Sequence, residues 1–118
     1  MEGKLGRRRG QLKALCGLIY LQDRYTEQRF LVDTGATVSV FPHRSSAAPS
    51  GPPLTGVDGR SIPSWGSVKK TSNFGLLTFI CSFILAAVSK PILGVDFLAE
   101  NRLLVDPSTQ QVLDSETL

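Results

Sequence analysis

The sequence Phe30-Leu31-Val32-Asp33-Thr34-Gly35-Ala36 joins a short apolar segment to a tight turn through one carboxylate. Residues 30–32 follow polar residues and are partly β-branched, which predicts a buried strand. Asp33 ends that strand, and a carboxylate beside so much apolar sequence is costly to bury unless a partner or a function uses it. Gly35 permits a positive φ or the close approach of another backbone. By itself the triplet fits an ordinary Asp-Thr-Gly turn as well as a functional loop.

Local patterns predict a β-rich chain with one short helix. Residues 15–21 and 29–32 form a hairpin pattern that delivers Asp33 at the end of its second arm. Asp58-Gly59 marks a tight turn between two short extended arms. Residues 45–53, rich in Ser, Ala and Pro, read as a surface loop. Further strands are expected at 37–41, 67–72, 76–79, 80–87, 103–105 and 111–113, and the helix at 95–100.

A second block far downstream reads Pro91-Ile92-Leu93-Gly94-Val95-Asp96-Phe97-Leu98 and is followed by Leu103-Leu104-Val105-Asp106. Together with the Asp33 segment, it resembles the active-site signature of aspartic proteases, most closely the retropepsins of retroviruses and long-terminal-repeat retrotransposons. In detail the two blocks are most similar to those of gypsy-class elements. The resemblance covers residues 15–114. It implies an all-β fold, a retropepsin-like closed barrel or sandwich of short strands with one short C-terminal helix, that acts as a two-fold homodimer.

The reaction implied by this resemblance is hydrolysis of peptide bonds by an aspartic endopeptidase. This chemistry needs two carboxylates that share a proton, one to deprotonate water and one to protonate the scissile carbonyl. The sequence contains one Asp-Thr-Gly and no internal repeat. The second carboxylate is therefore expected from a second copy of the chain, with Asp33 of each subunit on the two-fold axis. The expected substrate is an extended peptide, from the polyprotein of a retroelement.

The resemblance also assigns roles to individual residues. Asp33, Thr34 and Gly35 are the expected catalytic residues. Residues 54–67 match the flap, the hairpin that closes over a bound peptide. Thr37 departs from the acidic residue that many retropepsins carry two positions after the motif glycine. The expected substrate-binding residues are Ala36, Thr37, Val57, Asp58, Gly59, Ile62 and Ile92, with Val32 as a further subsite wall. Ile92, Leu93 and Gly94 are the expected structural support for the catalytic loop.

Length and charge indicate one folded domain after a basic tail. The chain has 118 residues and a net charge of +3, which fits a single domain. Five basic residues oppose one Glu in residues 1–13, whereas the rest carries eight basic and nine acidic side chains. We therefore expect a flexible tail at 1–13 and a protease domain at 14–118. The tail is read as a solvated linker in a polyprotein, or as a weak nucleic-acid contact.

The remaining chemistry-bearing residues do not suggest a metal or cofactor. His43 is the only histidine, so a zinc site would lack ligands and a Ser-His-Asp triad would depend on a loop residue. Cys16 and Cys81 lie in apolar contexts without C-x-x-C spacing and are expected to be buried free thiols in a reducing, cytoplasmic compartment. Residues 74–88 are short for a membrane-spanning helix and suit strands better. We expect no cofactor, no metal and no membrane partner.

Two other interpretations remain open at this point. A domesticated retropepsin fold could serve as a dimerisation or peptide-binding module with little turnover, although such a module would not need the Asp33 carboxylate. A small membrane-associated protein would instead use residues 74–88. The intact Asp33-Thr34-Gly35 favours the protease.

Overall fold

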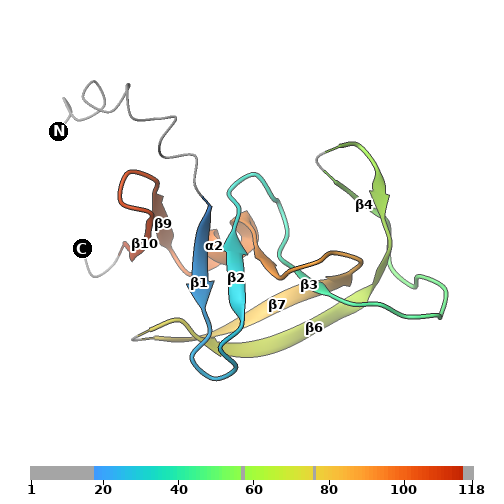
Figure 1. The fold of residues 1–118 in the computed structure, drawn as a ribbon, viewed down its shortest axis with the longest axis horizontal. Helices are drawn as coiled ribbons and strands as arrows, with labels where there is room; N and C mark the ends of the chain where they lie inside the picture. The colour runs from blue at the N-terminus through green and yellow to red at the C-terminus, as the bar shows by residue number, and fades with distance from the viewer. Residues whose placement is uncertain (1–17, 57, 76, 116–118) are drawn as a thin grey trace.

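The computed structural model describes residues 18–56, 58–75 and 77–115, which form a mostly β structure with one short helix (Figure 1). The expected tail at 1–13, and with it Cys16, lies outside the described residues. The strands are β1 (Ile19–Gln22), β2 (Arg29–Val32), β3 (Val40–Pro42), β4 (Leu54–Thr55), β5 (Ser61–Ile62), β6 (Ser64–Asn73), β7 (Thr78–Ala86), β8 (Ile92–Leu93), β9 (Leu103–Asp106) and β10 (Gln111–Asp114), and the helix is α2 (Val95–Glu100).

Six strands form the main sheet in the order β1-β2-β8-β3-β7-β6, and β4–β5 and β9–β10 form two small two-stranded sheets. The hairpins β1–β2 and β6–β7 are antiparallel. Short β8 lies between β2, with which it runs parallel, and β3, which it meets in antiparallel fashion. This pairing brings the segment around Gly94 beside the turn that follows β2, although about 60 residues separate them in sequence.

The core is formed by aromatic and aliphatic side chains from the sheet and the helix. Phe30 of β2 and Phe83 of β7 are each 1% exposed, with ring centroids 5.7 Å apart. Leu93 of β8 is fully buried, and Phe97 and Leu98 bring α2 onto the same cluster. Each such side chain contributes about 1.5–3 kcal/mol when it leaves water. The core therefore holds together β2, β8 and α2, the elements next to Asp33 in the fold.

A buried carboxylate joins the β1–β2 turn to the end of β6. Asp23 is 2% exposed and accepts hydrogen bonds from the backbone N–H of Tyr25 and Asn73 and from the Thr26 hydroxyl. Burial by itself raises the pKa of Asp23, but these hydrogen bonds outweigh it and hold the pKa below its ordinary value. These hydrogen bonds therefore hold the turn between β1 and β2 against the end of β6.

The structure confirms the predicted all-β class with one short helix, and the helix has the predicted bounds. Two strand predictions were wrong in detail. Residues 37–39 lie outside the strand, with a bend at 37–38, and β3 begins at Val40 because the Ser39 N–H is bonded to the Asp96 carboxylate instead of a neighbouring strand. The strands expected at 76–79 and 80–87 are one strand, β7, whose long hairpin with β6 pairs Asn73 with Thr78.

The apolar stretch at 74–88 therefore lies largely in a sheet strand. Within the ranges that the structure describes, no helix has both the length and the hydropathy needed to cross a membrane. Cys81 is 1% exposed in β7 and unpaired, as predicted. Burial, with smaller contributions from nearby carboxylates, raises the pKa of its thiol to about 12.

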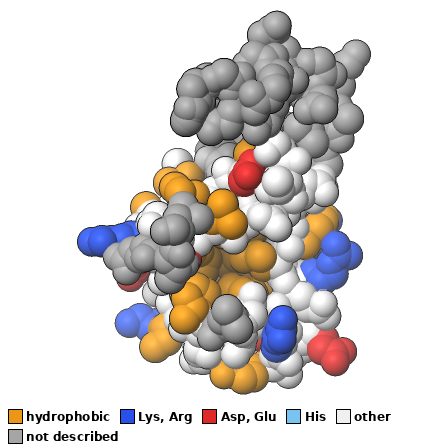
Figure 2. Space-filling model, turned by 90° about the vertical axis from the view of Figure 1, so that its left-hand side faces the viewer, with side chains coloured by type: hydrophobic (Ala, Val, Ile, Leu, Met, Phe, Trp, Pro, Cys, Tyr) orange, Lys and Arg blue, Asp and Glu red, His pale blue; other side chains and the backbone are white. Residues whose placement is uncertain are grey.

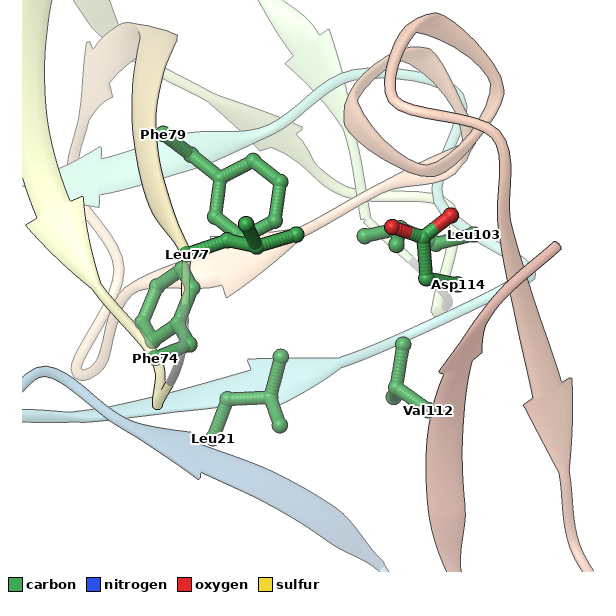
Figure 3. Close-up of a pocket in the computed structure, with 7 residues that line it drawn as sticks. All are labelled: Leu21, Phe74, Leu77, Phe79, Leu103, Val112 and Asp114. Atoms are coloured by element: carbon green, nitrogen blue, oxygen red, sulfur yellow. The ribbon is translucent and has the colours of Figure 1, made fainter. Parts of the chain in front are cut away.

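One apolar hollow of about 320 Å³ opens between β1, the start of β7 and the β9–β10 hairpin. Figure 2 shows hydrophobic side chains around a hollow on this side of the molecule. In Figure 3, Leu21, Phe74 and Phe79 line it from one side, and Leu103, Val112 and Asp114 from the other. Apart from the Asp114 carboxylate, the side chains that line it are apolar.

Candidate active site

Asp33 stands at the end of β2 in a turn that is fixed by backbone hydrogen bonds. Its N–H donates to the carbonyl of Leu93 over 3.0 Å, and its carbonyl accepts from the N–H of Ala36 over 3.1 Å. The Gly35 N–H donates to Asp33 Oδ1 over 2.9 Å, which orients the carboxylate. Gly35 does not have a positive φ. A Cβ there would lie 3.3 Å from Asp33 Oδ1, a tight contact that the glycine avoids.

Gly94 allows the second block to pack directly against this turn. A Cβ at Gly94 would lie 2.7 Å from the carbonyl oxygens of both Ala36 and Val38, so no side chain fits. The following N–H, from Val95, donates to the Ala36 carbonyl over 2.8 Å. The start of α2 and the turn after Asp33 are consequently held as one unit.

Ser39 and Asp96 close this unit with a second set of hydrogen bonds. The Ser39 hydroxyl accepts from the buried N–H of Gly94 over 2.9 Å and donates to Asp96 Oδ1 over 2.7 Å. The Ser39 N–H donates to Asp96 Oδ2 over 3.1 Å. Because Ser39 is only 1% exposed, its hydroxyl replaces water for the Gly94 N–H. The carboxylate of Asp96 is therefore committed to structure.

A groove of about 410 Å³ opens beside Asp33. Its walls come from the turn after β2, from β3 and β8, and from the β4–β5 hairpin. The lining residues are Asp33, Gly35, Ala36, Thr37, Val38, Val40, Leu54, Thr55, Gly56, Ile62, Val88 and Ile92. Asp33 is the only ionisable residue among them, and the aliphatic walls suit apolar side chains of a peptide.

The expected flap is the hairpin of β4 and β5. Its turn is closed by the Gly59 N–H, which donates to the Gly56 carbonyl over 3.0 Å, and Gly59 has a φ of +83°. Arg60 Nε lies 3.3 Å from Asp58 Oδ2 across the turn. At the base of the hairpin, Trp65 donates its ring N–H to the carbonyl of Ala47 over 3.1 Å. In Figure 1 this hairpin stands away from the main sheet.

The structure brings six of the predicted residues together in the groove: Asp33, Gly35, Ala36, Thr37, Ile62 and Ile92. Thr34 is exposed beside the groove, and Asp58 and Gly59 lie at the hairpin tip, outside its lining. Val57 lies outside the described residues. The expectation that Val32 forms a subsite wall was wrong, because its side chain belongs to the buried core.

Sequence reasoning missed the Ser39–Asp96 link and three apolar lining residues, Val38, Val40 and Val88, and it placed the lining residues Leu54, Thr55 and Gly56 only in the flap as a whole. Val38 and Val40 were read only as strand residues, and Val88 only as part of an apolar run. No local signal marks Ser39 and Asp96 as partners, since 57 residues separate them. Among the described residues, no three His, Cys, Asp or Glu side chains form a group that could hold a metal ion.

A half-buried carboxylate in an apolar groove can take up or release a proton next to a bound peptide. By itself it supplies one of the two proton-transfer functions that peptide hydrolysis through activated water requires. A second carboxylate within reach of Asp33 would complete the pair. No other acidic residue among the described residues lines the groove, so the part of the chain that the structure describes supplies one carboxylate of the pair.

Comparison with solved structures finds EIAV protease, determined in complex with the inhibitor HBY-793. The TM-score is 0.53 with 23% sequence identity, and the match covers 71% of this chain and 86% of the EIAV protease chain. No protein-family model matches the sequence. No curated protein matches it either. The likeness establishes that the chain has a retropepsin-like fold.

Proposed function

We propose that this chain is one subunit of a homodimeric aspartic endopeptidase. The observation that carries the proposal is Asp33, the one ionisable residue among the described residues that line the groove, on a turn held by the Leu93 carbonyl and the Gly35 N–H. The fold likeness to a retroviral protease supports the same conclusion. The motif similarity extends the proposal to the processing of a retroelement polyprotein, of the gypsy class.

In the proposed dimer, Asp33 and the partner's Asp33 face each other across the two-fold axis. Two carboxylates at close range cannot both ionise easily, so their pKa values separate and they share one proton. The ionised carboxylate takes a proton from water, whose oxygen attacks the scissile carbonyl carbon. The protonated carboxylate donates to the carbonyl oxygen, giving a neutral tetrahedral diol. Proton transfer to the amide nitrogen then allows the C–N bond to break.

The supporting residues take roles that follow from their positions. Thr34, exposed at the turn, would bridge to the partner subunit, and the Gly35 backbone would face the substrate. Ala36, Thr37, Ile62 and Ile92 would contact an extended peptide. The flap at 54–67, including Val57, Asp58 and Gly59, would close over that peptide through main-chain hydrogen bonds. Leu93 and Gly94 would hold the turn that carries Asp33 in place.

Cleavage of a broad peptide library by wild type and Asp33→Asn tests the proposal. The assay runs at mildly acidic pH, at several protein concentrations, with and without strongly excluded salts that favour apolar association. We expect pepstatin-sensitive cleavage whose rate rises faster than linearly with protein concentration, since only the dimer holds both carboxylates. Asp33→Asn should abolish it, whereas the matched control Glu27→Gln, which neutralises an exposed carboxylate on the β1–β2 turn, should retain it.

The same experiment separates the enzyme from a peptide-binding module. No cleavage at any concentration by a protein shown to be folded and dimeric would contradict the enzyme. Peptide binding by that inactive wild type, equal in Asp33→Asn, would then identify a binding module.

A further inference from the structure

A cationic cluster lies on the outer face of the β1–β2 hairpin. In this antiparallel pair, direct partners share one face of the sheet. Ile19 and Leu21, with their partners, pack into the core. Tyr20 therefore lies on the opposite face, where Arg29, the partner of Gln22, lies diagonally across from it.

Arg29 and Lys90 converge on the ring of Tyr20. The guanidinium carbon of Arg29 lies 4.2 Å from the ring centroid, and Lys90 Nζ lies 5.5 Å from it. Lys90 also donates a hydrogen bond to the Tyr20 hydroxyl over 3.2 Å. Both cations are exposed, and no carboxylate of the described chain lies within ion-pair distance of either. Two positive groups are thus held together, with no counter-charge from the described part of the chain.

The donors of this cluster remain available to a ligand. A guanidinium stacked on an aromatic ring keeps its N–H groups at its edge, where they match both oxygens of a carboxylate. Lys90 has two further N–H donors, and the Tyr20 hydroxyl, which accepts from Lys90, still has its own hydrogen to donate. The three side chains therefore present several donors to one anion.

The cluster also borders the groove that contains Asp33. Lys90 lies between Val88 and Ile92, which both line that groove. β8, which carries Ile92, pairs with β2, which pairs with β1, so Tyr20 is two strands away from Ile92. Two strand spacings amount to about 10 Å, or roughly three residues of an extended peptide. A peptide in the groove can reach the cluster with a side chain a few residues from its centre.

We propose that Tyr20, Arg29 and Lys90 form an outer subsite that binds an Asp or Glu side chain of the peptide substrate. The proposal rests on the proposed function, because it needs a peptide in the groove beside Asp33. A peptide is favoured over a phosphate ligand because the cluster shares its sheet and the segment 88–92 with the apolar groove. The substrate class is then an extended peptide with apolar residues at its centre and an acidic residue to one side.

The test compares matched peptides that carry Glu or Gln at successive positions outward from the scissile bond. At about pH 6 the Glu side chain is ionised. Wild type should prefer Glu at one position, with a kcat/KM ratio of about two- to fivefold, the range typical of exposed ion pairs. In Arg29→Gln/Lys90→Gln this ratio should fall to about one. The charge-matched control Lys69→Gln/Arg44→Gln, which includes β6 at the opposite edge of the sheet, should keep the wild-type ratio.

A wild type without preference at any position, or a preference that survives in Arg29→Gln/Lys90→Gln, would overturn the inference. If wild type cuts no peptide, the proposed function fails. The proposed subsite is then tested by calorimetry, which measures the affinity of Asp33→Asn for the same peptides. Equal affinity for the Glu and Gln forms would overturn it, and a Glu preference lost on removing the two cations would support it. Tight binding of poly(U) RNA that depends on Arg29 and Lys90, without any Glu preference, would identify a phosphate site instead and overturn it.

Discussion

Replacing Ser39 by Ala should destabilise the protein far more than the loss of one hydroxyl on a surface strand. In Ser39→Ala the buried N–H of Gly94 loses its acceptor at 2.9 Å, and Asp96 loses its donor at 2.7 Å. An unsatisfied buried N–H costs about 1–3 kcal/mol. The hydrogen bond to the partly exposed Asp96 adds about 0.5–1 kcal/mol, because water and the Ser39 N–H still solvate that carboxylate. We expect a total loss of about 2–3 kcal/mol.

Urea denaturation can measure this loss with an intrinsic probe, since Trp65 is the only tryptophan. Its fluorescence and the far-UV circular dichroism should give coincident transitions if unfolding is two-state. The midpoint should fall at an unchanged m-value, and the melting temperature should fall by roughly 10–15 °C. All variants are compared at one protein concentration, because dimerisation would make stability concentration-dependent.

The matched control is Ser82→Ala, which removes the hydroxyl of an exposed serine on β7. This control should change the free energy of unfolding by less than about 0.5 kcal/mol. A cycle with Asp96→Ala should show coupling between positions 39 and 96, because the two side chains share one hydrogen bond. Two results would contradict the proposed role of the Ser39–Asp96 link. One is a Ser39→Ala protein as stable as Ser82→Ala. The other is that the effects of Ser39→Ala and Asp96→Ala on the free energy of unfolding simply add.

Three further outcomes follow from individual residues. Because the folded-state pKa of Asp23 lies below its unfolded value, near 3.8, its carboxylate stabilises the fold above that pH, and this contribution is lost as pH falls through the folded pKa. The urea midpoint of the wild type should therefore fall as the pH is lowered below about 3.8, and in Asp23→Asn this fall should be smaller. An equal fall in both proteins would contradict this role of Asp23. Gly94→Ala should cost about 1–3 kcal/mol or more, since two carbonyl oxygens must move; wild-type thermal stability would count against the close contact. In a Cys16→Ser background, Cys81 should react with iodoacetamide only after unfolding, because it is buried and its pKa is raised to about 12; rapid labelling of the native protein would disprove this.

Much of the local structure was predictable from short-range patterns. The hairpin arm at 29–32, the turn at Asp33 and the helix at 95–100 follow from apolar runs, turn-forming residues and their order along the chain. The start of β3 was not predictable, because the Ser39 N–H bonds to the carboxylate of Asp96, 57 positions away, and not to a neighbouring strand. The same holds for Val32, whose burial depends on which face of β2 meets the core.

Short-range patterns are enough to show that a single carboxylate ends an apolar strand, and that a glycine-containing block downstream resembles its supporting element. Three features emerge from the folded chain alone: Gly94 meets the Asp33 turn without room for a Cβ, Ser39 and Asp96 hold the two segments together, and Arg29 and Lys90 share one tyrosine ring near the groove. The difference comes from how far apart in sequence the interacting residues lie. Turn and strand preferences act between neighbours in sequence, whereas close backbone approach and shared side-chain partners depend on which distant segments the core brings together.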